Sequence, residues 1–190
     1  MNINMHIKKF AALFAVLTCL LVFASAEQTG STQTEVNFIP GQLNLLETTT
    51  MNFGSHIISG ESKSYPMTNA DFSVMINDLR GTGVGWKLTA IAENFQSGAA
   101  ATLPGALIRL ENPSAQNQAA VGSPPIAEDN ILLDCDGTTS ALIAQADLNQ
   151  GFSDWRFTWL DTNVKLTIPG GVATAGDHAM TITWTLSDTP

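Results

Sequence analysis

The sequence is poor in cysteine, in basic residues and in long apolar segments. Among its 190 residues are two cysteines, and only Cys135 lies outside the N-terminal apolar region. One cysteine cannot form an internal disulfide, so a disulfide-stapled scaffold is excluded and packing must supply the stability. We expect Cys135 to be a buried, small apolar side chain, with a reactive thiol as the less favoured alternative.

Basic residues are the second scarce class. Eight Lys and Arg stand against 17 Asp and Glu, which gives a formal charge of −9. Without the first 26 residues, six basic residues remain against the same 17 acidic ones, and the formal charge becomes −11. A chain this acidic repels phosphate backbones, and it has no basic amphipathic stretch. Nucleic acid and anionic lipid are therefore not expected as partners.

One uninterrupted apolar run occurs, from Phe10 to Phe23. Its 14 residues fall short of the ~20 that a membrane-spanning helix needs. Lys8 and Lys9 supply positive charge before the run, and Ala24-Ser25-Ala26 follows it as a small-x-small site. These three parts predict a secretory signal peptide over residues 1–26.

The signal peptide sets the expected location of the protein. Cleavage is predicted between Ala26 and Glu27, which would release a secreted chain that does not insert into the membrane. Cys19 leaves lipidation open as an alternative, although the preceding Thr18 is larger than a lipobox favours. The C-terminal end shows no apolar tail and no sorting motif. We therefore expect surface attachment to need neither a covalent link nor a membrane anchor.

The rest of the chain is predicted to be a short lead-in followed by one β domain. Residues 27–41 are polar and threonine-rich, which is typical of a flexible lead-in. Residues 42–190 are long enough for one ordinary domain. Within it, several segments alternate apolar and polar residues, which predicts half-buried antiparallel strands. These segments are residues 71–78, 86–90, 106–110, 164–168 and 180–186.

Glycine and proline clusters separate these segments, and no apolar stripe of helical period has a useful length. We therefore predict an all-β fold, an antiparallel β-sandwich in a single domain. Residues 138–149 could form a short helix, but a strand followed by a loop is favoured. Residues 111–130 are polar and contain prolines, so we expect a long surface connection there.

No catalytic motif is evident. His56 and His178 lie in no motif with a nucleophile, and we expect His178 at the surface where a strand begins. The acidic residues from Glu128 to Asp136 could hold calcium with the following Gly137, although the EF-hand spacing is not met. A solvated acidic loop is the favoured alternative. We expect no enzyme activity, no catalytic residue, no metal and no cofactor.

Two Trp-x-Leu motifs carry most of the functional information. Trp86 and Leu88 follow the glycine-rich run Arg80–Gly85, and Trp184 and Leu186 lie near the C-terminal end. Alternate residues of a strand share a face, so each motif places an indole beside an isobutyl group. We predict that both tryptophans point to one side of a sheet or into one core. Core packing is one interpretation, and a ledge on which sugar rings stack is the other.

Three segments together resemble a known family. Asn77–Thr89 is close to the signature D-x-R-G-x-G-x-G-W-x-L, and Leu166–Pro169 with Thr183–Pro190 is close to a characteristic C-terminal ending. Asn52-Phe53-Gly54 is a weaker match. With these segments the chain resembles the WxL-domain family of Gram-positive cell-surface proteins, and the resemblance covers about residues 42–190.

The resemblance implies non-covalent attachment to the cell wall, with peptidoglycan or another wall glycan as the partner. It also implies assembly with other WxL proteins or with membrane-anchored surface proteins. Two alternatives stay open: a structural subunit of a multi-protein surface complex that acts by protein–protein contacts, and a secreted carbohydrate-active enzyme of unrecognised type. The wall-binding candidates are Arg80, Gly81, Gly83, Gly85, Trp86, Leu88, Trp184 and Leu186.

Overall fold

The computed structural model describes residues 31–117 and 122–188, and the statements below concern those residues. No helix among them is long and apolar enough to cross a membrane. The predicted signal peptide and its cleavage site lie outside the described residues. Residues 31–42 hold no regular structure, and the strands belong to a compact unit that spans Phe38–Pro190.

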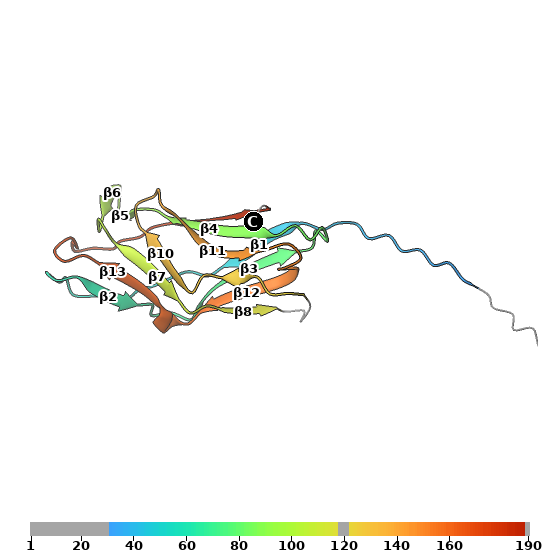
Figure 1. Ribbon diagram of the computed structural model, residues 1–190. Helices are drawn as coiled ribbons and strands as arrows, with labels where there is room; N and C mark the ends of the chain where they lie inside the picture. The colour runs from blue at the N-terminus through green and yellow to red at the C-terminus, as the bar shows by residue number, and fades with distance from the viewer. Residues whose placement is uncertain (1–30, 118–121, 189–190) are drawn as a thin grey trace, which may run out of the picture. The chain divides into compact units, whose positions relative to one another are not determined.

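Short strands make up this unit, with one short 3-10 helix, Asp161–Asn163, after the twelfth (Figure 1). The turns between them fall at the glycine and proline clusters that the sequence shows. In chain order the strands are β1 Leu43–Thr48, β2 Lys63–Pro66, β3 Phe72–Asp78, β4 Trp86–Ala92, β5 Phe95–Ser97, β6 Ala100–Thr102, β7 Leu107–Glu111, β8 Ser114–Asn117, β9 Ile126–Ala127, β10 Asn130–Asp134, β11 Ser140–Ala146, β12 Ser153–Trp159, β13 Val164–Ile168 and β14 Ile182–Ser187.

The strands form three four-stranded sheets and one hairpin. The first sheet has the order β1-β3-β12-β8, the second β10-β7-β13-β2 and the third β14-β4-β11-β9, while β5 pairs with β6. These strand pairings are all antiparallel. Ring contacts join the first sheet to the third: Trp86 meets Phe157 with centroids 6.1 Å apart, and Trp184 lies 5.6 Å from Phe72. The predicted all-β, antiparallel sandwich is confirmed.

Alternation along the strands decides which side chains form the core. In β3, Phe72, Val74 and Ile76 are at most 1% exposed, because successive side chains of a strand point to opposite faces. The same pattern buries Trp86 and Leu88 in β4. The five predicted strand segments are confirmed as β3, β4, β7, β13 and β14, with ends that differ by up to two residues.

Residues 111–130 differ from the long surface connection that the sequence predicts. They hold β8, which pairs with β12 at an edge of the first sheet, and β9, which pairs with β11. β8 is mostly polar and β9 has only two residues, so neither shows an apolar alternation, and pairing with an ordered neighbour stabilises both. Residues 138–149 form the favoured strand followed by a loop, since β11 ends at Ala146.

Cys135 is buried and forms no disulfide, as predicted. Its side chain is 5% exposed, and burial raises the pKa of its thiol to about 11. A thiol with this pKa stays protonated at neutral pH, and the thiolate is the nucleophilic form. The residue therefore acts as a small apolar side chain of the core.

Candidate functional site

The glycine-rich run before Trp86 is closed by an ion pair. The Arg80 guanidinium donates to both carboxylate oxygens of Asp78, at 2.9 and 2.8 Å, and also to the carbonyls of Val84 and Gly85. The Asp78 side chain is only 2% exposed. The hydrogen bonds that Arg80 donates to Asp78 raise the pKa of Arg80 above its usual value. Arg80 thus fastens the two ends of the loop together and is already occupied by the protein's own oxygens.

The glycines of this run allow a close approach to the loop that follows β11. A Cβ on Gly85 would lie 1.8 Å from the carbonyl oxygen of Ala146, and one on Gly83 would lie 2.6 Å from the Asn149 side chain. Gly81 differs, because a Cβ there would meet nothing within 4 Å although its φ is +66°. Gly83 and Gly85 therefore serve loop packing, and Gly81 serves the turn.

The first Trp-x-Leu motif lies in the core. Trp86 and Leu88 are both 0% exposed, and the Trp86 indole N–H donates to the carbonyl of Gly151 at 3.2 Å. Neither side chain offers a surface to a ligand from outside. If these two residues contribute to wall binding, they do so by holding the third sheet in place.

The second motif lies at the open side of the sandwich. Trp184 is half-buried, with its ring stacked on Phe72 at 27° between the ring planes, and Leu186 is also half-buried. Trp184 lines a cleft of about 1050 Å³. Of the candidates predicted from the sequence, Trp184 alone is among the residues that line this cleft.

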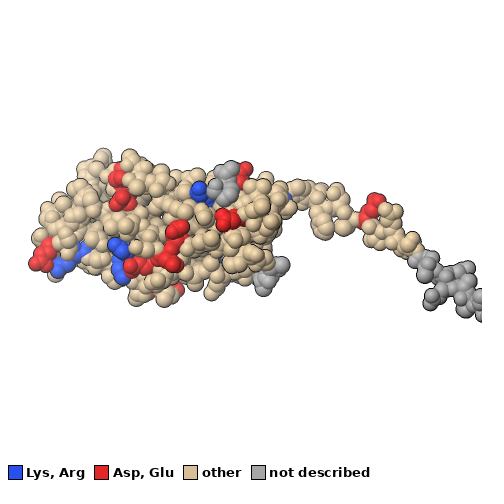
Figure 2. Space-filling view, in the orientation of Figure 1, with Lys and Arg blue, Asp and Glu red and all other residues tan. Residues whose placement is uncertain are grey.

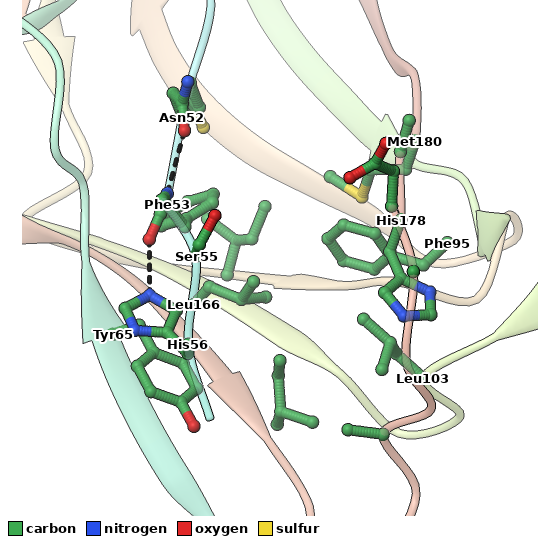
Figure 3. Close-up of a pocket in the computed structure, with 18 of the residues that line it drawn as sticks. Asn52, Phe53, Ser55, His56, Tyr65, Phe95, Leu103, Leu166, His178 and Met180 are labelled. Carbon is green, nitrogen blue, oxygen red and sulfur yellow. Dashed lines mark hydrogen bonds between the residues drawn. The ribbon is translucent and has the colours of Figure 1, made fainter. Parts of the chain in front are cut away.

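Two segments without regular strand structure form the sides of the cleft. One follows β1 and covers residues 49–59, and the other precedes β14 and covers residues 173–181. Figure 3 shows the cleft between them, with Phe53 and His56 on one side and His178 and Met180 on the other. The floor is made of core side chains, namely Phe72, Phe95, Leu103, Ile108 and Leu166. An apolar floor beneath polar sides is typical of a ligand pocket.

The two histidines of the domain lie on opposite sides of the cleft. The exposed His56 ring stacks on Tyr65 of β2, with centroids 3.9 Å apart. The half-buried His178 has Thr102 Oγ1 and the Thr174 carbonyl as hydrogen-bond partners, both at 2.9 Å. His178 precedes β14 by four residues, so it does not begin that strand as predicted. Sequence reasoning did not find the cleft, because its two sides have no periodic pattern.

The end of the acidic loop is stabilised by hydrogen bonds within the loop itself. Asp136 accepts from the backbone N–H groups of Thr138 and Thr139 at 2.7 and 2.8 Å, and from the Thr139 hydroxyl. These bonds hold the pKa of Asp136 well below its usual range. Within residues 31–117 and 122–188, no three acidic, histidine or cysteine side chains are grouped closely enough to hold a metal ion.

The few basic side chains of the domain are mostly paired. Ion pairs join Lys63 to Glu61, Arg80 to Asp78, Arg109 and Lys165 to Glu111, and Arg156 to Glu47. On the face shown in Figure 2, the blue groups are few and lie beside red ones. No Lys or Arg is among the described residues that line the cleft. The arrangement gives a concave, partly apolar and acidic site.

A β-sandwich whose signature tryptophan lines an open cleft has the architecture of a binding domain. Residues 26–190 match the family described as "WxL domain surface cell wall-binding". The chain belongs to the WxL family, whose domain binds the cell wall at the cell surface. Comparison with the curated proteins and with the solved structures gave no match.

Proposed function

We propose that the domain attaches non-covalently to the Gram-positive cell wall by binding peptidoglycan in the cleft beside Trp184. The observation that carries this proposal is the position of the cleft, since it opens where the second Trp-x-Leu motif meets Phe72 of the opposite sheet. The sequence signature of a wall-binding family thus borders this cleft. Secretion by the predicted signal peptide would bring the domain to this ligand.

The charges favour peptidoglycan over the anionic polymers of the wall. Six basic side chains follow residue 26. Within residues 31–117 and 122–188, five of them are held in ion pairs, and Lys87 is in none of those pairs. A polyphosphate ligand is attracted by a field of unpaired basic groups. The cleft offers instead backbone amides, threonine hydroxyls and apolar surface, which suit an uncharged or zwitterionic ligand.

Co-sedimentation with purified peptidoglycan tests the proposal. Residues 27–190 are mixed with peptidoglycan freed of anionic polymers, and the bound fraction is measured across a salt series. We expect physiological salt to leave binding unchanged or, where intact walls are used, to strengthen it. The reason is that salt screens the repulsion between the acidic domain and the anionic polymers of the wall. A steep fall with salt would mean that a local positive patch carries the interaction.

Matched surface variants locate the site. Ile57 lines the cleft and is 93% exposed, whereas Leu148 lies outside the cleft and is 72% exposed. Ile57→Ser should weaken sedimentation and Leu148→Ser should not, and both should keep the stability of the unaltered chain because neither side chain is packed. Equal binding by the two variants would show that the binding site lies outside the cleft. A folded chain that never sediments would favour a structural subunit that acts through protein contacts.

A further inference from the structure

The aromatic rings at the cleft are engaged with one another. Trp184 stacks on Phe72 with centroids 5.6 Å apart, and His56 stacks on Tyr65 at 3.9 Å. A sugar-binding ledge needs a flat aromatic face that is free to meet the sugar. Here each of the four rings has one face against its partner, and Phe72 is only 1% exposed, so the aromatic surface left for a sugar is small.

The cleft instead exposes an unpaired strand edge. β14 is the terminal strand of the third sheet, and no described strand pairs with its outer edge. The Thr181 carbonyl accepts from the Glu93 N–H at 2.9 Å. In an antiparallel ladder the next residues alternate, so Ile182 and Trp184 direct their N–H and C=O groups away from β4. Both residues line the cleft, where their amide groups can bond a peptide backbone.

The floor and the charge of the cleft fit the same kind of ligand. Phe95, Leu103 and Leu166 are at most 6% exposed and end at the cleft, so they can receive small aliphatic groups. The carboxylates that line the cleft are Glu61 and Asp177. Glu61 is paired with Lys63, whereas Asp177 is exposed and belongs to none of the ion pairs among the described residues. Asp177 is therefore available to an ammonium group.

We propose that the cleft binds the peptide stems of peptidoglycan rather than its glycan strands, with a free ammonium of the stem placed against Asp177. This inference rests on the proposed function and names the part of the polymer that is recognised. Stems carry alanine methyl groups, backbone amides and an amino group, whereas glycan strands carry hydroxyls and N-acetyl groups. The apolar floor, the edge of β14 and the Asp177 carboxylate match those three features in turn.

Selective digestion separates the two parts of the polymer. The chain is sedimented with intact peptidoglycan and with the same material after an amidase has removed the stems. A soluble alanine–isoglutamate–lysine–alanine stem peptide and a tetramer of N-acetylglucosamine serve as competitors. We expect loss of binding after amidase treatment, competition by the stem peptide and none by the tetramer. Retained binding to stem-free strands overturns this inference but keeps the proposed function, whereas failure to bind intact peptidoglycan removes both.

A pair of charge-matched variants tests the role of Asp177. Asp177→Asn should weaken binding of the stem peptide about twofold to fivefold, the range for an exposed ion pair. Asp129→Asn removes the same charge from the turn between β9 and β10, outside the cleft, and should leave binding unchanged. N-acetylation of the stem peptide should weaken its binding to the unaltered chain. It should not change the binding of the peptide to the Asp177→Asn variant. If the two variants weakened binding equally, the loss of affinity would come from the change in net charge. The proposed contact between Asp177 and the ammonium group would then be wrong.

Discussion

Leu186 of β14 lies directly opposite Leu88 of β4 in the antiparallel ladder. Trp184 lies opposite Ala90, four residues from Trp86 or about 13 Å along the strand. The two tryptophans therefore point to the same side of one sheet, as predicted, but they do not meet. Trp86 is buried in the core while Trp184 borders the cleft, so two identical motifs have different surroundings.

The difference in burial predicts different costs of truncation. Trp86→Ala should lower the free energy of unfolding by ~3–5 kcal/mol, because a fully buried indole and its hydrogen bond are removed. Trp184→Ala should cost less, since its side chain is half-buried, and it should weaken peptidoglycan binding in a chain that still folds. Urea unfolding followed by fluorescence and circular dichroism measures both. A larger cost for Trp184→Ala would contradict the placement of the two rings.

The two glycines Gly81 and Gly85 provide a matched test of loop packing. Gly85→Ala forces a methyl group to 1.8 Å from the Ala146 carbonyl oxygen, so the loop must shift, whereas Gly81→Ala meets nothing within 4 Å. Gly81→Ala should cost only the ~1–2 kcal/mol of a left-handed conformation. Gly85→Ala should cost clearly more, as measured by thermal unfolding. Similar melting temperatures for the two variants would show that the glycine run is not held by this contact.

The Arg80–Asp78 ion pair predicts a loss of stability rather than a loss of binding. Arg80→Ala leaves the buried Asp78 carboxylate uncompensated, which should cost about 3 kcal/mol. The double variant with Asp78→Asn should recover part of this loss, because no buried charge remains. Wall binding by the folded fraction should be unchanged in both. If Arg80→Ala stayed fully stable but no longer sedimented, Arg80 would be a wall contact after all.

Cys135 predicts a pH dependence in the alkaline range. Burial raises the pKa of its thiol from 9.0 to about 11 in the folded chain, so folding favours the protonated form. The stabilisation is complete below pH ~9 and is lost as the pH rises towards 11. The thiol should react slowly with a disulfide reagent at pH 8 until urea unfolds the chain. Fast labelling of the folded chain, or an identical pH dependence for Cys135→Ala, would disprove this.

Alternation of residues was sufficient to predict the core strands, and it failed at the polar edge. β3 and β4 each bury every second side chain against the opposite sheet, and a period of two makes such strands visible. β12 has the same pattern in Trp155, Phe157 and Trp159, a signal that the sequence analysis did not use. β8 is Ser-Ala-Gln-Asn, and its strand form comes from pairing with β12, a long-range contact that no local pattern contains.

The cleft was not predictable for a related reason. Its sides come from residues 49–59 and 173–181, which lie more than a hundred residues apart and contain none of the strands. Only folding brings them to the same opening. Residue types did predict the buried Cys135 and the antiparallel sheets. A lone apolar thiol and an alternation of apolar and polar residues along a strand are both visible in the local sequence. The ion pair that holds Arg80 could not be separated from a ligand contact by sequence alone.

The pairing of β14 with β4 also governs how the domain must fold. Ile182 pairs with Ala92, so the two strands are separated by about ninety residues of sequence that must come together before they can pair. Contacts between such distant segments slow folding into the range of milliseconds to seconds. Until β14 is in place, Leu88 and Phe72 lack the side chains that cover them, and the outer edge of β4 is a template for another strand. Early intermediates of this chain are therefore the species most at risk of aggregation, and the addition of β14 lowers this risk because it covers the edge of β4 and the side chains beneath it.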